Sequence, residues 1–255
     1  MYGRLATCGR LSIGLARHAT SDGLPMTALQ VQDVWKYFGD FPALRGVSFD
    51  VEEGSCLALL GRNGAGKTTL LKILAGLSRP GKGAVKVMGE DTRAQVTRRR
   101  IGVLGHGIGI YDELSAEENL RLFARLYAIP NSELVVSQWL ERTGLQNVRE
   151  GLVREFSRGM RQRLAVARAF MHQPALMLLD EPFTALDDRG IAVLQDFLND
   201  ARRAGRTIIM STHQLREALE LATDVALINR GKLAYRGART QEMLDDPTLL
   251  YRLHG

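Results

Sequence analysis

The stretch Gly61-Arg62-Asn63-Gly64-Ala65-Gly66-Lys67-Thr68 decides the fold of this chain. Its pattern, Gly-x-x-x-x-Gly-Lys-Thr, is typical of a loop that binds nucleotide phosphates. The flanking sequence fits, because the apolar run at 56–60 predicts a central parallel strand and residues 68–77 predict a helix. Glycines let backbone N–H groups approach phosphate oxygens, and a helix N-terminus adds partial positive charge. Because a strand, the loop and a helix follow one another in this order, a glycine-rich turn that matches the pattern by chance is disfavoured.

The loop predicts contacts with both a nucleotide and a metal ion. We expect Lys67 to contact the β and γ phosphates of ATP, and the Thr68 hydroxyl to bind Mg²⁺. The other predicted nucleotide contacts come from the rest of the loop and from the start of the helix. They are Gly61, Arg62, Asn63, Gly64, Ala65, Gly66 and Thr69.

Two adjacent acids, Asp180 and Glu181, end the apolar run at 176–179. A buried strand that ends in two carboxylates carries a desolvation cost, which a bound cation would offset. We therefore expect Asp180 to hold Mg²⁺, through water, and Glu181 to act as general base on the attacking water. By themselves the two residues would suggest only surface acids, but the phosphate loop favours the catalytic interpretation.

A histidine follows another apolar run at 207–210, in the sequence Ser211-Thr212-His213. A side chain beyond the carboxyl end of a parallel strand lies where such sheets bind ligands. We predict that His213 reaches the γ phosphate. A lone histidine here would more often be a packed surface residue.

The rest of the chain predicts an α/β fold with a P-loop NTPase core, an antiparallel β subdomain and an inserted helical subdomain. Alternating apolar residues at 29–34 and 47–51 predict the antiparallel strands. The block at about 107–160 is mainly helical, with a capping box at 115–118. Residues 27–255 form the predicted domain, and 1–26 are an N-terminal extension, either disordered or upstream of a true start at Met26. A basic targeting leader is a disfavoured alternative.

In order, spacing and content, these motifs resemble those of the ATP-binding subunits of ABC transporters. The resemblance implies that Phe38, or its neighbour Tyr37, stacks on adenine. It also implies that Phe156-Ser157-Arg158-Gly159-Met160 is the signature segment, whose Ser157 and Gly159 face ATP bound to the opposite subunit. Asp187 would lie in the loop that crosses the dimer interface. The block at 107–160 would dock on membrane subunits.

The chain departs from the family pattern at two places. Phe156, Arg158 and Met160 replace three of the five usual signature residues, which affects the expected hydrolysis rate more than ATP binding. His106 stands where the family has a glutamine that senses Mg²⁺ and water. A given ring nitrogen of neutral histidine accepts a hydrogen bond in only one of the two tautomers, so His106 could replace the glutamine oxygen only in that tautomer. His106 therefore predicts a pH-sensitive coupling step between about pH 5.5 and 8.

Composition narrows the function further. The chain has 255 residues, a formal charge of +6 and 45% hydrophobic residues, and its longest apolar runs fall far short of the ~20 residues that cross a bilayer. Transmembrane work would therefore belong to another chain. Charge alone permits a nucleic-acid partner, but dispersed arginines favour a solvated surface. The two cysteines, Cys8 and Cys56, have no disulfide or metal spacing.

We therefore expect an ATPase that acts as a homodimer around two ATP, with Mg²⁺, and that powers integral membrane permease subunits from the cytoplasmic face of the membrane. No nucleic acid is expected. The segments Gly105-His106 and 111–120 are similar to the haem-exporter ATPases of cytochrome c maturation. Multidrug and antibiotic exporters share much of this similarity and stay an alternative. A soluble ABC ATPase acting on ribosomes or DNA is the alternative of another class.

Overall fold

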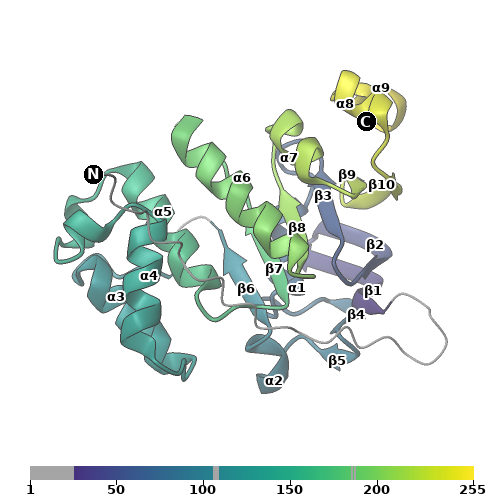
Figure 1. Ribbon diagram of the computed structural model, residues 1–255. Helices are drawn as coiled ribbons and strands as arrows, with labels where there is room; N and C mark the ends of the chain where they lie inside the picture. The colour runs from purple at the N-terminus through teal and green to yellow at the C-terminus, as the bar shows by residue number, and fades with distance from the viewer. Residues whose placement is uncertain (1–25, 106–108, 185, 187) are drawn as a thin grey trace.

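The computed structural model describes residues 26–105, 109–184, 186 and 188–255 (Figure 1). The predicted N-terminal extension, except Met26, lies outside these residues, as do His106 and Asp187. The strands are β1 (Thr27–Phe38), β2 (Phe41–Glu52), β3 (Cys56–Leu60), β4 (Lys82–Val87), β5 (Glu90–Asp91), β6 (Ile101–Leu104), β7 (Leu176–Asp180), β8 (Thr207–Ser211), β9 (Asp224–Asn229) and β10 (Lys232–Ala238). The α-helices are α1 (Lys67–Leu74), α2 (Gln95–Arg98), α3 (Ala116–Leu126), α4 (Ser132–Arg142), α5 (Arg158–Phe170), α6 (Asp188–Arg203), α7 (Leu215–Leu221), α8 (Gln241–Asp245) and α9 (Leu249–His254).

The strands form two sheets. One has four strands in the order β2-β1-β4-β5 and is antiparallel, as the sequence predicts for residues 29–34 and 47–51. The other has six strands in the order β10-β9-β3-β8-β7-β6. Strand β3 lies between β8 and β9 and is parallel to both, which confirms the predicted central parallel strand at 56–60. Strands β9 and β10 pair antiparallel, and the other neighbouring strands described in this sheet pair parallel.

Alternation along β3 divides the core into two layers. Leu57 and Leu59 pack with apolar residues of α1 and of the antiparallel sheet. Cys56, Ala58 and Leu60 pack on the other face, with residues of α5, α6 and α7. Because successive side chains of a strand point to opposite faces, a strand buried on both faces is apolar throughout. Burial also raises the pKa of the Cys56 thiol to about 12.

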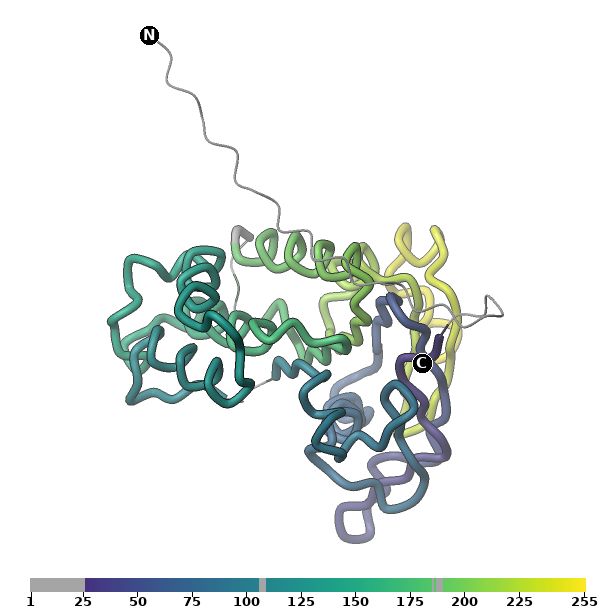
Figure 2. Tube along the Cα trace, turned by 60° about the horizontal axis from the view of Figure 1, so that its bottom comes forward, coloured from purple at the N-terminus to yellow at the C-terminus, as the bar shows by residue number. Residues whose placement is uncertain are grey.

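The helices α3, α4 and α5 form a lobe beside β6, at the edge of the six-stranded sheet, and the same lobe stands at the left of Figure 2. The predicted capping box is present, since Ser115 Oγ accepts from the Glu118 N–H at 3.2 Å and the Glu118 carboxylate accepts from the Ser115 N–H at 2.8 Å. The helix predicted at 68–77 is shorter, because α1 ends at Leu74 and Gly76 follows with φ of 69°.

In the described part of the chain, no helix has the length and hydropathy that a membrane crossing needs.

Candidate nucleotide-binding and hydrolysis site

The phosphate loop connects β3 to α1 and is shaped by two crowded glycines. Gly61 has φ of 154°, and a Cβ there would lie 2.4 Å from the Ile228 carbonyl oxygen. Gly66 has φ of 111°, and a Cβ there would lie 2.8 Å from the Ala43 carbonyl oxygen. Side chains at these positions would collide with the backbone of β9 and β2. The loop conformation therefore depends on glycine at both ends.

The other residues predicted to bind nucleotide differ in their exposure. Arg62, Asn63, Gly64 and Thr68 are exposed, Thr69 is half-buried, and Ala65 is buried. Residue Thr68 follows Lys67 in the first turn of α1, so its exposed hydroxyl lies beside the loop. Exposed backbone and hydroxyl groups at a helix N-terminus suit a ligand that arrives from solvent.

Lys67 is buried at the base of the loop. Its Nζ donates to the Gly61 carbonyl oxygen at 2.7 Å and to the Arg62 carbonyl oxygen at 3.3 Å. Burial lowers the pKa of Lys67, while the nearby carboxylates of Glu181 and Asp180 oppose this by raising it. The ammonium group of Lys67 therefore lies within the electrostatic reach of both predicted catalytic acids.

Asp180 ends β7 and is paired across the sheet with Ser211, the last residue of β8. The buried Ser211 hydroxyl donates to Asp180 Oδ1. This hydrogen bond occupies one carboxylate oxygen and orients the side chain. The parallel register of β7 and β8 explains why two residues 31 positions apart meet here.

Glu181 is the first residue after β7 and has φ of 52°, which is uncommon for a residue other than glycine. Its backbone N–H donates to the Ser211 carbonyl oxygen at 2.8 Å. Its carboxylate oxygen Oε2 lies 2.8 Å from His213 Nδ1 and accepts from the His213 N–H at 3.2 Å. The sheet therefore holds Glu181 in an unusual backbone conformation, of the kind that clusters at functional sites.

The predicted residues Lys67, Asp180, Glu181 and His213 thus meet at the carboxyl ends of β3, β7 and β8. His213 is 63% exposed, whereas Glu181 is 14% exposed. A partly buried acid next to an exposed imidazole can activate water beside the site.

The aromatic pair lies in the hairpin between β1 and β2. Tyr37 and Phe38 are 49% and 59% exposed, and Tyr37 stacks on Trp35 with its ring centroid at 6.3 Å. Phe38 pairs with Phe41 across the hairpin. Strand β2 then passes the loop at Ala43, beside Gly66. The hairpin therefore joins the exposed aromatic rings to β2, the strand that packs beside the phosphate loop.

Ser157 opens α5, as predicted. Its Oγ accepts from the Met160 N–H at 3.2 Å and caps the helix. Ser157 and Arg158 are exposed, and Gly159 is half-buried. Among the described residues, the Arg158 guanidinium makes no hydrogen bond or ion pair. The structure therefore places these residues at an exposed helix N-terminus in the lobe, rather than among the four residues that meet at the sheet edge.

Two further residues contact the site elements, and the sequence offered no signal for either. The Tyr251 hydroxyl, on α9, accepts from the Gly61 N–H at 2.9 Å. Arg168, on α5, donates to the Val103 carbonyl oxygen at 3.2 Å, and its guanidinium lies 4.6 Å from the centroid of Phe123. Arg168 therefore ties the signature helix to β6 and to α3.

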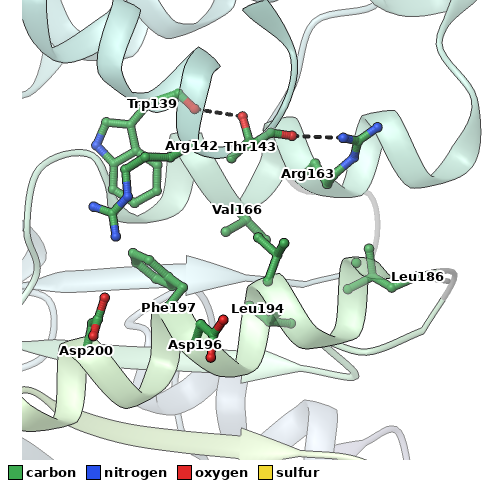
Figure 3. Close-up of a pocket in the computed structure, with 12 residues that line it drawn as sticks. Trp139, Arg142, Thr143, Arg163, Val166, Leu186, Leu194, Asp196, Phe197 and Asp200 are labelled. Carbon is green, nitrogen blue, oxygen red and sulfur yellow. Dashed lines mark hydrogen bonds between the residues drawn. The ribbon is translucent and has the colours of Figure 1, made fainter. Parts of the chain in front are cut away.

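A cleft of about 190 Å³ lies between α4 and α5 on one side and α6 on the other (Figure 3). In it the Arg142 guanidinium lies 5.1 Å from the Trp139 ring centroid and 5.4 Å from that of Phe197. Arg163 donates to the Thr143 carbonyl oxygen at 2.9 Å. The cleft marks the junction between the lobe and the core, and among the described residues none of those predicted to catalyse or to bind nucleotide or metal lines it.

Magnesium fits the residues that the loop and β7 provide. Thr68 offers an exposed hydroxyl, and Asp180 has one carboxylate oxygen beyond the one bonded to Ser211. Mg²⁺ prefers such hard oxygen ligands and is usually held by one or two protein groups together with phosphates and waters. The donor set is therefore chemically suitable for Mg²⁺ that arrives with ATP.

Comparison with known proteins shows the family of this chain. A sequence profile of the family described as "ABC transporter" matches residues 44–184. The "ABC transporter ATP-binding protein NatA" of Bacillus subtilis is 40% identical over 201 residues, which cover 77% of this chain and 82% of that protein. The "Nod factor export ATP-binding protein I" of Rhizobium meliloti (strain 1021) is 35% identical, covering 91% of this chain and 71% of that protein.

Two further matches extend the comparison. The "Daunorubicin resistance ATP-binding protein DrrA3" of Streptomyces coeruleorubidus is 37% identical, covering 83% of this chain and 68% of that protein. A solved structure described as "Structure of ATP binding subunit of ABC transporter" superimposes with a TM-score of 0.79 at 31% identity, covering 90% of this chain and 95% of that one. This chain therefore belongs to the ATP-binding subunits of ABC transporters and is an ATPase.

Proposed function

We propose that two copies of this chain bind two ATP molecules between them and drive an exporter made of separate membrane permease subunits. The observation that carries the proposal is the meeting of Lys67, Asp180, Glu181 and His213 at one edge of the sheet. This arrangement suits hydrolysis of a phosphoanhydride, which needs positioning of charge more than covalent chemistry.

Within one chain, each residue has a role that follows from its contacts. Lys67 would transfer its hydrogen bonds from the Gly61 and Arg62 carbonyl oxygens to the β and γ phosphates. The Glu181 carboxylate would take a proton from the water whose oxygen attacks the γ phosphorus, as the bond to the bridging oxygen of ADP breaks. His213 would orient Glu181 through Nδ1 and present its other ring nitrogen to the γ phosphate.

Thr68 and Asp180 would hold Mg²⁺, which neutralises charge on the phosphates when bound. Phe38, with Tyr37 as the alternative, would stack on adenine through its exposed face. The backbone of residues 61–66 would surround the phosphates, with Thr69 at the start of the helix.

The second chain would complete each site. Ser157 and Gly159 lie at an exposed helix N-terminus, which favours an approaching phosphate. In a head-to-tail dimer this terminus would face the ATP held by the opposite phosphate loop. Arg158 would add positive charge there. Asp187 and His106 lie outside the described residues, and their roles at the dimer interface and in coupling stay predictions.

Residues 107–160 would pass the movement to the membrane subunits, at the cytoplasmic face of the membrane. Arg168 supports this relay, because it links α5, which carries the signature segment, to β6, which leads to His106. A change at the γ phosphate would thereby reach the lobe.

Export is supported by the relatives named for Nod factor export and daunorubicin resistance. Haem export for cytochrome c biogenesis is the narrower second candidate, favoured by the similarity of Gly105-His106 and residues 111–120 to those ATPases. None of the relatives reported above is named for haem. Cargo is selected by chains other than this one, so the fold of the ATP-binding subunit does not specify which compound is transported.

The test is to purify tagged Glu181→Gln protein from gently solubilised native membranes with Mg-ATP and to identify the proteins that accompany it. Glu181→Gln should bind ATP without hydrolysing it and so hold two chains closed around ATP. Lys67→Ala is the matched control, because it should bind ATP poorly and should not accumulate this closed dimer. A polytopic membrane protein enriched with Glu181→Gln over the control supports the proposal. Recovery of ribosomes or DNA without a membrane chain would instead favour the soluble class of ABC ATPase.

A deletion strain separates the cargo candidates. Loss of c-type cytochromes, restored by the wild-type gene but not by the Lys67→Ala gene, would support haem export. Normal c-type cytochromes would remove that candidate and leave an exporter of another compound.

A further inference from the structure

The C-terminal helix α9 reaches back to the start of the phosphate loop. The Tyr251 hydroxyl accepts a hydrogen bond from the Gly61 N–H at 2.9 Å, across 190 positions of sequence. Helix α9 is anchored there, because Leu250 is buried in the core and the Tyr235 ring stacks on His254 with centroids 5.1 Å apart. The contact is therefore part of a packed interface between the end of the chain and its nucleotide loop.

Gly61 is fixed on both sides by these contacts. Its N–H is bonded to Tyr251, and its carbonyl oxygen accepts from Lys67 Nζ at 2.7 Å. Gly61 is buried and crowded against the Ile228 carbonyl oxygen. A buried N–H without a partner is costly, so loss of the phenol oxygen would favour a shift of this peptide. Such a shift would move the loop on which Lys67 and the phosphates depend.

The chemistry of the phenol suits this task. Burial raises the pKa of Tyr251 and the Glu181 carboxylate raises it further, while the hydrogen bond from Gly61 lowers it. The group therefore stays neutral at physiological pH. A neutral phenol oxygen accepts from a backbone N–H without placing a negative charge beside the phosphates.

We propose that Tyr251 is a positioning residue of the nucleotide site, and that its hydroxyl fixes the first peptide of the phosphate loop for ATP. The C-terminal segment then contributes to ATP binding as well as to the stability of the fold.

The test compares Tyr251→Phe with Tyr235→Phe in the full-length protein. Both variants lose one phenol oxygen near the same end of the chain. The hydroxyl of Tyr235 makes no hydrogen bond to any residue in the described part of the chain, so this variant is a matched control. The measurements are the dissociation constant for a fluorescent ATP analogue with Mg²⁺, the KM and kcat of ATP hydrolysis, and the melting temperature.

Tyr251→Phe should raise the dissociation constant about 5-fold or more, and raise KM with it. Tyr235→Phe should leave both within 2-fold of wild type. A purely structural role would lower the melting temperature of Tyr251→Phe while leaving its affinity for ATP at the wild-type value. That result would overturn the proposal.

A second measurement does not depend on nucleotide binding. Hydrogen exchange should be slow at the Gly61 amide in the wild-type protein and at least several-fold faster in Tyr251→Phe, with no change in peptides from β7. Equal exchange at Gly61 in both proteins would overturn the proposal, because it would mean that Tyr251 does not protect this amide.

Discussion

Replacing Glu181 by glutamine should stop hydrolysis while sparing the fold and ATP binding. The Glu181 carboxylate accepts from the His213 N–H at 3.2 Å and lies 2.8 Å from His213 Nδ1. A glutamine side-chain oxygen can accept the same hydrogen bonds from the same position. The amide cannot take a proton from water at neutral pH, so the variant loses only the base.

The expected loss follows from the usual contribution of a positioned general base, which is about 10²- to 10⁴-fold in rate. This corresponds to ~2.7–5.4 kcal/mol in activation free energy. The folding free energy should change by less than about 1 kcal/mol, because the partner His213 is mostly exposed and the retained hydrogen bonds are of the same kind.

The assay is phosphate release at saturating Mg-ATP, together with analogue binding and thermal unfolding. Glu220→Gln is the matched control, since it makes the same chemical change at the exposed carboxylate that pairs with Arg216 on α7. A Glu181→Gln rate within 3-fold of wild type, with unchanged KM, would refute the assignment of Glu181 as general base.

Substitutions also test the adenine contact, the loop glycine and a partly buried histidine, His172. Phe38→Ala should raise the dissociation constant for ATP about 5-fold or more, as expected for loss of a base-stacking ring. Tyr37→Ala should change this constant less than 2-fold. A larger effect of Tyr37→Ala than of Phe38→Ala would identify Tyr37 as the stacking residue. In denaturant unfolding, Gly61→Ala should destabilise the fold by at least ~1 kcal/mol more than Gly205→Ala. Both positions have positive φ, but a Cβ at Gly61 meets the Ile228 carbonyl oxygen, whereas a Cβ at Gly205 has nothing within 4 Å. Equal losses would mean that the contact with Ile228 relaxes freely. Burial lowers the pKa of His172 in the folded protein to about 4, whereas a histidine of the unfolded chain has a pKa of about 6.5. Below about pH 6.5 the unfolded chain therefore binds a proton that the folded protein does not bind. The free energy of unfolding should then fall by up to ~3 kcal/mol as the pH drops toward 4. His172→Phe should lack this part of the pH dependence, and an unchanged pH profile would contradict it.

The core of the site could be predicted because its residues lie in short local patterns. The phosphate loop is continuous in sequence, and its glycines, lysine and threonine act within one strand-loop-helix unit. The acids were predicted from the end of the apolar run at 176–179. The capping box of α3 was confirmed for the same reason, since Ser115 and Glu118 lie within one turn.

The remaining contacts depend on chain segments that meet only in the folded state. Asp180 and Ser211 meet through the register of β7 and β8, which the sequence does not specify. The partnership of Glu181 with His213 requires both that register and a positive φ at Glu181. Tyr251 follows the last recognisable motif and carries no pattern of its own, so only the packing of α9 reveals its contact with Gly61.

The most direct test of the proposed head-to-tail dimer mixes two inactive variants. Lys67→Ala removes the phosphate contact of one chain. Ser157→Asp keeps a good helix cap but places a negative charge at the N-terminus of α5, where the partner's phosphate would lie. In a mixed dimer both defects fall in one site and the other site is intact.

An equal mixture should recover about a quarter of the wild-type ATPase rate, because about half of the dimers are mixed and each has one working site of two. Each variant by itself should stay near background. A mixture that never exceeds the average of the two separate rates would contradict a site shared between two chains.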